Sequence, residues 1–160
     1  MPDHNDPLAM RVVYQLPNMD QIVVRKDVLY KSVECDDLKM DVYYPQDMQR
    51  ESPQKLRAAV LLVHGGATPE QVEHIKDTTL YESWGQLLAA AGFVTVMFKH
   101  RSYGGYTTIP EAGSDVDDLV TYVRAHGAEL GIDGDALCLF AFSGGSLAGL
   151  RTALRGAPAY

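Results

Sequence analysis

A serine stands between an apolar run and a helical pattern near the end of the sequence. The run covers residues 136–142, and Ser143, Gly144 and Gly145 follow it directly. A sharp strand-to-helix turn lifts a serine clear of its neighbours, and small flanking residues let the backbones pass closely. The helix that starts behind the turn offers N–H groups and positive dipole potential to a developing negative charge. The pattern predicts Ser143 as a nucleophile.

A second glycine-rich turn, His64-Gly65-Gly66-Ala67, follows the apolar run 58–63. Small residues allow such a loop to aim its N–H groups at the point where an acyl oxygen becomes negative. Each donor of this kind contributes about 3 kcal/mol in the transition state. We expect Gly66, Ala67 and Gly144 to supply the donors of an oxyanion hole.

The elements that would position these turns alternate regularly. Uninterrupted apolar runs at 58–63, 93–98 and 136–142 are typical of strands covered on both faces of a parallel sheet. Helical patterns lie between and after them, and alternating segments at 28–33 and 38–44 predict a hairpin. The fold class is therefore α/β, a mostly parallel sheet with flanking helices and an N-terminal antiparallel hairpin. Ligands bind beyond the carboxyl ends of such strands, where both glycine-rich turns lie.

Local signals suggest the ends of the helices and of the domain. Residues 1–20 carry three prolines and no sustained period, which predicts a loosely ordered arm before one domain at 21–160. Thr79 and Glu82 have the spacing of a capping box. A further helix is expected to begin at Ser114, where Asp115, Asp117 and Asp118 suit the helix dipole and do not require a metal ion.

The composition excludes several functional classes. With 14 basic and 21 acidic residues the net charge is −7, and no basic run exceeds two residues, so nucleic acids and anionic membranes are not expected partners. Cys35 and Cys138 form no metal or disulfide spacing, and we expect Cys138 to be buried and inert. The acidic N-terminus does not resemble a signal peptide. These features predict a soluble, cytoplasmic protein without a metal or cofactor.

The combination of motifs resembles the α/β-hydrolase family, in its esterase branch with an H-G-G loop. The matching segments are His64-Gly65-Gly66, residues 116–133 and Phe142-Ser143-Gly144-Gly145, within a resemblance that covers about residues 28–156. It implies a serine hydrolase that cleaves esters through an acyl-enzyme. Ser143 would then be the nucleophile, with Gly66, Ala67 and Gly144 in the oxyanion positions. Ala141 takes the place of the first glycine in the family's G-x-S-x-G pattern.

The resemblance stops after the serine. In the family the catalytic acid and base follow the nucleophile, whereas residues 144–160 contain no Asp, Glu or His. His64 belongs to the oxyanion loop, and His126 is expected about a strand length away. His100 is on the correct edge of the sheet, and the positions of His4 and His74 are open.

Two functions remain open from the sequence. The chain is either the nucleophile half of a serine esterase, completed by residues beyond Tyr160 or by another chain, or a non-catalytic hydrolase fold that acts as a binding or oligomerisation module. In both cases the strand at 136–142 is expected to be an exposed apolar edge that seeks a partner. Tyr103 and Tyr106 are candidate substrate contacts, and Tyr81 and Trp84 are expected in the core.

Overall fold

A computed structural model describes residues 6–34, 36–48, 55–101 and 108–155. Its strands are β1 (Val23–Val33), β2 (Asp36–Tyr44), β3 (Arg57–Val63), β4 (Val94–Phe98) and β5 (Ile132–Ala141). Its helices are α1 (Pro69–Glu73), α2 (Thr79–Ala90), α3 (Ile109–Ala125), α4 (Gly127–Leu130) and α5 (Gly145–Arg155). Three 3-10 turns are η1 (Pro7–Ala9), η2 (Met19–Gln21) and η3 (Ile75–Asp77).

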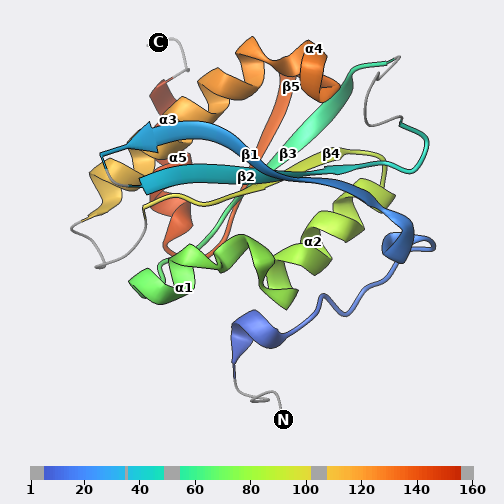
Figure 1. The fold of residues 1–160 in the computed structure, drawn as a ribbon, viewed down its shortest axis with the longest axis horizontal. Coiled ribbons are helices and arrows are strands. Elements are labelled where there is room, and N and C mark those ends of the chain that lie inside the picture. The colour runs from blue at the N-terminus through green and yellow to red at the C-terminus, as the bar shows by residue number, and fades with distance from the viewer. Residues whose placement is uncertain (1–5, 35, 49–54, 102–107, 156–160) are drawn as a thin grey trace.

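The five strands form one mixed sheet in the order β1-β2-β4-β3-β5 (Figure 1). β3 pairs in parallel with β4 on one side and with β5 on the other. β1 and β2 form an antiparallel hairpin, which joins the sheet through antiparallel pairing of β2 with β4. The predicted fold class, with its three parallel strands and its hairpin, is confirmed.

Helices cover both faces of the sheet. One core cluster contains side chains of α3 and α5, such as Leu119 and Ala148, together with Leu61 of β3. The other contains Tyr81 and Ala89 of α2, packed on the opposite side of β3 and β4. Figure 1 shows α2 on one side of the sheet and α3 on the other. β4 is buried along its whole length, which explains its uninterrupted apolar sequence.

β5 forms an edge of the sheet. Within the described part of the chain it pairs with β3 alone. Cys138 is exposed, and Phe140 keeps 37% of its surface in solvent. The expectation that Cys138 is buried is therefore wrong, because the strand that carries it has no neighbour on its outer side.

Two helix starts differ from the sequence prediction. α3 begins at Ile109, with Thr108 as its N-cap and Pro110 in its first turn, so the prediction of a start at Ser114 is wrong. The hydrogen-bonded capping box belongs to Thr68 and Gln71 at the start of α1. α2 instead has Thr78 at its N-cap position, without a side-chain capping bond.

The segment before β1 runs along α2. The backbone N–H of Val12 donates to Ser83 Oγ at 3.0 Å, and the Arg11 guanidinium donates to Gln86 Oε1 at 3.2 Å.

Among the described residues, no helix combines the length and the apolar character needed to cross a membrane.

Candidate active site

Ser143 occupies a strained turn between β5 and α5. Its φ is 46°, in the left-handed region that residues other than glycine rarely adopt, and its side chain is exposed. Phe142 N–H donates to Val63 O at 2.9 Å, which ties the turn to the end of β3. Gly145 N–H donates to Phe142 O at 2.9 Å and closes the turn into the helix. The predicted sharp turn is present, and it holds the serine at the carboxyl end of the sheet.

The turn at Ser143 packs directly on the loop after β3. A Cβ placed on Gly145 would lie only 2.2 Å from His64 O, so no side chain fits there. A Cβ on Gly65 would lie 3.1 Å from Ser143 Cβ, and one on Gly144 would lie 3.6 Å from Gly66 N. The fold therefore brings together the two glycine-rich turns, which lie almost eighty residues apart in the sequence.

The candidate donors are three backbone N–H groups of these turns. Within the described residues, the N–H groups of Gly66, Ala67 and Gly144 donate to no protein acceptor. Gly66 and Gly144 face each other across the junction. α5, whose first residue is Gly145, directs the positive end of its dipole toward the same place.

Two stacked imidazoles, those of His64 and His100, contact the loop after β3. The rings of His64 and His100 are parallel within 11°, with centroids 3.6 Å apart, and both side chains are fully buried. The backbone N–H of His100 donates to His64 Nε2 at 3.3 Å, so the ring proton of His64 is on Nδ1. His64 Nδ1 donates to Gly65 O at 2.7 Å. His100 Nε2 in turn donates to His64 O at 3.2 Å. The two residues link the ends of β3 and β4.

Burial keeps both imidazoles neutral. It lowers the pKa of His64 to about 4 and holds the pKa of His100 well below its usual value. His100 Nδ1 has no hydrogen-bond partner among the described residues. The ring of His100 is enclosed, and its Nε2 ties the end of β4 to His64 O at the end of β3.

The remaining histidines are dispersed. His126 stacks on Tyr122 at the end of α3, and its Nδ1 donates to Tyr122 O at 2.9 Å. It lies at the opposite end of β5 from Ser143. His74 is exposed after α1, and His4 lies outside the described residues.

An ion-pair cluster holds the chain directly after β4. Asp115 is fully buried, and it accepts hydrogen bonds from Arg101 N, Nε and Nη2 and from Lys31 Nζ at 2.7–3.0 Å. Burial alone would raise the pKa of the Asp115 carboxyl, but these hydrogen bonds outweigh it and lower the pKa. The expectation that Asp115 serves the dipole at a helix start is wrong, since it lies in the middle of α3 as the acceptor of this cluster. Tyr103 and Tyr106, the candidate substrate contacts, lie outside the described residues.

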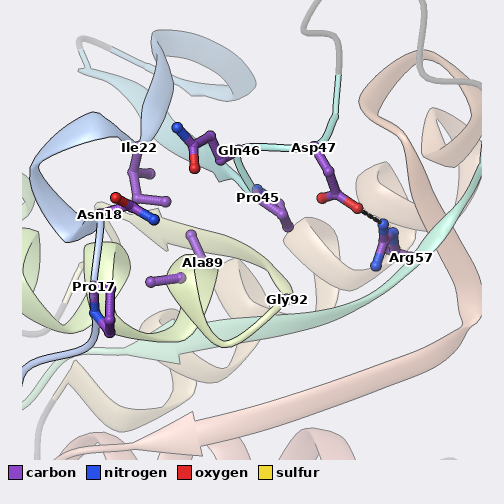
Figure 2. A pocket seen from close by; sticks show the side chains of 10 residues that line it. Pro17, Asn18, Ile22, Pro45, Gln46, Asp47, Arg57, Ala89 and Gly92 are labelled. Carbon is purple, nitrogen blue, oxygen red and sulfur yellow. Dashed lines mark hydrogen bonds and ion pairs between the residues drawn. The ribbon is translucent and has the colours of Figure 1, made fainter.

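An open hollow of about 490 Å³ lies at the opposite end of the central strands from Ser143 (Figure 2). Its lining includes Pro45 after β2, Arg57 at the start of β3 and Gly92 before β4. Figure 2 shows Arg57 turned toward Asp47, with which it forms an ion pair. Because these residues lie at the amino ends of β3 and β4, the hollow is separate from Ser143.

Tyr81 is a site residue that sequence reasoning placed only in the core. Its hydroxyl accepts a hydrogen bond from Gly65 N–H at 3.1 Å, and its ring meets Phe142 edge-on at 5.0 Å between centroids. No local sequence signal marks this role, because it depends on where the loop after β3 passes.

Comparison with known families and structures gives consistent matches. The family model BD-FAE matches residues 40–157. The native structure of a thermophilic esterase from Thermogutta terrifontis is 27% identical, with a TM-score of 0.60, over 82% of this chain and 44% of the esterase. Its propionate-bound form matches with the same identity and TM-score over 82% and 45%. The apo form of esterase 2 from that organism is 23% identical, with a TM-score of 0.61, and supports the fold alone.

These matches cover much of this chain but a minor part of the others. The chain spans less than half the length of each of these esterase chains. No curated protein sequence matches it.

Proposed function

This chain belongs to the BD-FAE family, whose domains are α/β-hydrolase-like, and from that premise we propose that it carries the nucleophile half of a serine esterase. The observation that carries the proposal is the exposed Ser143 at φ 46°, packed against Gly65 at the carboxyl end of the sheet. Backbone strain held at an exposed nucleophilic residue is typical of functional sites. The esterase neighbours support hydrolysis of an ester as the reaction class.

In the proposed reaction, Ser143 Oγ attacks the carbonyl carbon of the ester. The hydroxyl proton passes to a general base, and the carbonyl oxygen becomes an oxyanion. Collapse of this intermediate breaks the bond to the alcohol, which leaves with that proton, and an acyl-serine remains. Water then attacks the acyl-serine by the same steps and releases the carboxylic acid and free Ser143.

The oxyanion would be held by Gly66, Ala67 and Gly144. Their N–H groups have no acceptor in the described part of the chain, and Gly66 and Gly144 lie across the junction from each other. Each aligned donor contributes about 3 kcal/mol to the transition state. The dipole at the start of α5 adds to the same stabilisation.

The base and acid are proposed to come from polypeptide outside the described residues. His64 and His100 are buried and neutral, and His126 lies at the far end of β5. A polypeptide that pairs with the open edge of β5 would reach the Ser143 end of that strand. The greater length of the esterase chains is consistent with this arrangement.

The proposed substrates are esters of short carboxylic acids. Esterase structures from Thermogutta terrifontis hold propionate and butyrate, at 27% and 26% identity to this chain. We extend this preference to acyl groups of three or four carbons here.

We also propose a cytoplasmic location for the protein, since two cysteines far apart in the sequence fit a reducing compartment.

Hydrolysis of p-nitrophenyl butyrate tests this function. We expect slow turnover by the chain, since an oxyanion hole and bound substrate alone retain about 10³-fold catalysis over water when triad members are missing. Complementation with the polypeptide that supplies the base and acid should raise turnover well above this residual rate. In the complemented protein, Ser143→Ala should return turnover to the residual rate, because the backbone donors remain, whereas Ser146→Ala, three residues further on, should leave it unchanged. Equal turnover by the complemented protein and its Ser143→Ala variant would refute the proposal.

A non-catalytic binding or oligomerisation module is the second candidate. It is favoured by the open edge of β5 and by three exposed leucines of α5, Leu147, Leu150 and Leu154, which are 45–63% exposed. Their spacing of three and four residues places them on one face of the helix. Stable self-association together with equal turnover by the complemented protein and its Ser143→Ala variant would favour this function.

A further inference from the structure

Tyr81 of α2 contacts both glycine-rich turns of the candidate site. Its hydroxyl accepts the Gly65 N–H at 3.1 Å, and the side chain is 3% exposed. Its ring meets Phe142, the residue before Ser143, edge-on at an interplanar angle of 88°. The same ring lies 6.4 Å from the ring of His64 between centroids.

The hydrogen bond to Tyr81 completes the fixation of one peptide plane. The peptide between His64 and Gly65 has its carbonyl bound to His100 Nε2 at 3.2 Å and its N–H bound to Tyr81 at 3.1 Å. Because a trans peptide is planar, with its carbonyl and N–H pointing in opposite directions, these two bonds fix the rotation of the plane.

The next peptide plane carries the candidate oxyanion donor. Gly65 O is bound to His64 Nδ1 at 2.7 Å, so the Gly66 N–H of the same planar peptide points away from the imidazoles. Glycine has wide backbone freedom, and without restraint the Gly65 dihedral angles would let the second plane turn against the first. Tyr81 therefore acts at the plane that precedes the donor.

We propose that Tyr81 is a positioning residue for the oxyanion loop. By fixing the peptide between His64 and Gly65, its hydroxyl aims the Gly66 N–H toward the space beside Ser143. The direction of this N–H matters for the reaction only if the proposed esterase function holds. The hydrogen bond to Gly65 and its effect on the loop are independent of that function.

A pair of matched variants, Tyr81→Phe and Tyr43→Phe, tests the proposal. Each removes one buried tyrosine hydroxyl and keeps the ring. The Tyr43 hydroxyl has no hydrogen-bond partner among the described residues, and Tyr43 packs on the same face of the sheet. Removing it therefore breaks no bond in the loop, and thermal unfolding checks that both variants fold.

The first readout is hydrogen exchange of the Gly65 amide, followed by NMR. Loss of one net hydrogen bond should speed exchange at Gly65 about fivefold to tenfold in Tyr81→Phe. Tyr43→Phe should leave it at the wild-type rate. Unchanged exchange in Tyr81→Phe, or an equal increase in Tyr43→Phe, would overturn the proposal.

The second readout is inactivation by a fluorophosphonate of the protein complemented with the polypeptide that supplies the base and acid. It is resolved into the inhibitor's binding constant and the maximal rate of covalent reaction. A misdirected donor affects the transition state, so Tyr81→Phe should lower the maximal rate about tenfold and change binding by less than about twofold. Weaker binding with an unchanged maximal rate would refute the positioning role. If wild-type Ser143 does not react, the proposed esterase function fails. Exchange at Gly65 still tests whether the hydrogen bond to Tyr81 restrains the loop.

Discussion

Replacement of Gly145 by alanine should disrupt the junction between the two glycine-rich turns, whereas the same replacement at Gly144 should be tolerated. A Cβ on Gly145 would lie 2.2 Å from His64 O and 2.8 Å from Val63 O. A Cβ on Gly144 has Gly66 N at 3.6 Å as its nearest neighbour, which is an ordinary contact. The two positions are adjacent in the chain, so each variant controls for the other.

The expected cost follows from these contacts. Both obstacles at Gly145 are backbone atoms, so α5 or the end of β3 must move by about 1 Å to restore van der Waals separation. Such overpacking costs about 1–3 kcal/mol, and loss of the hydrogen bond from His100 to His64 O adds about 1 kcal/mol. The better helix propensity of alanine offsets about 1 kcal/mol. The net destabilisation is about 1–3 kcal/mol.

Thermal unfolding followed by far-UV circular dichroism measures this difference. For a chain of this length, the loss corresponds to a fall in Tm of roughly 2–12 °C for Gly145→Ala. Gly144→Ala should stay within about 2 °C of wild type. Equal Tm values for the two variants would refute the close packing of α5 on the end of β3.

Three further predictions concern charge, pH and the open edge. Asp115→Asn removes the buried carboxylate that Lys31 and Arg101 share and should cost about 3 kcal/mol in chemical denaturation, whereas Asp117→Asn, at a more exposed ion pair, should cost less than about 1 kcal/mol. The pKa of His64 falls from 6.5 in the unfolded chain to about 4 in the fold. Its contribution to the free energy of unfolding is therefore complete above pH 6.5 and is lost as the pH falls toward 4. Unfolding free energy should therefore decrease by about 3 kcal/mol between pH 6.5 and 4, and a flat profile would contradict this. In light scattering at micromolar concentration the chain should self-associate, and Cys138→Lys should shift it toward monomer, since an edge lysine opposes strand pairing. A monomeric wild type would refute this.

The sequence was sufficient to predict the sheet and the junction of the two turns. Apolar runs identify β3, β4 and β5 as strands, although only β3 and β4 are largely buried, and alternation identifies the hairpin of β1 and β2. Parallel strands place their carboxyl ends at one edge, which is why Gly65 and Ser143 were expected together.

The errors came from local signals that have two interpretations. Carboxylates after Ser114 suit a helix start, but Asp115 is instead the acceptor of a buried ion-pair cluster that only the tertiary structure assembles. Two sequence features do mark the helix starts that the structure shows. Pro110 lies in the first turn of α3, and the Thr68-x-x-Gln71 spacing forms the capping box of α1.

Other features could not be found from sequence patterns at all. The exposure of Cys138 depends on which strand ends the sheet, and the contact of Tyr81 with Gly65 depends on how α2 packs beneath the loop. Neither is encoded in the spacing of nearby residues.

Covalent labelling of Ser143 tests the central claim most directly. Fluorophosphonate treatment of the protein complemented with the polypeptide that supplies the base and acid should add one phosphonyl group to this chain, and peptide mapping should place it on Ser143. Ser146→Ala, which changes an exposed serine in the first turn of α5, should be labelled like wild type. Ser143→Ala should take up no label. Absence of the adduct in wild type, or its persistence in Ser143→Ala, would contradict the assignment of Ser143 as the nucleophile.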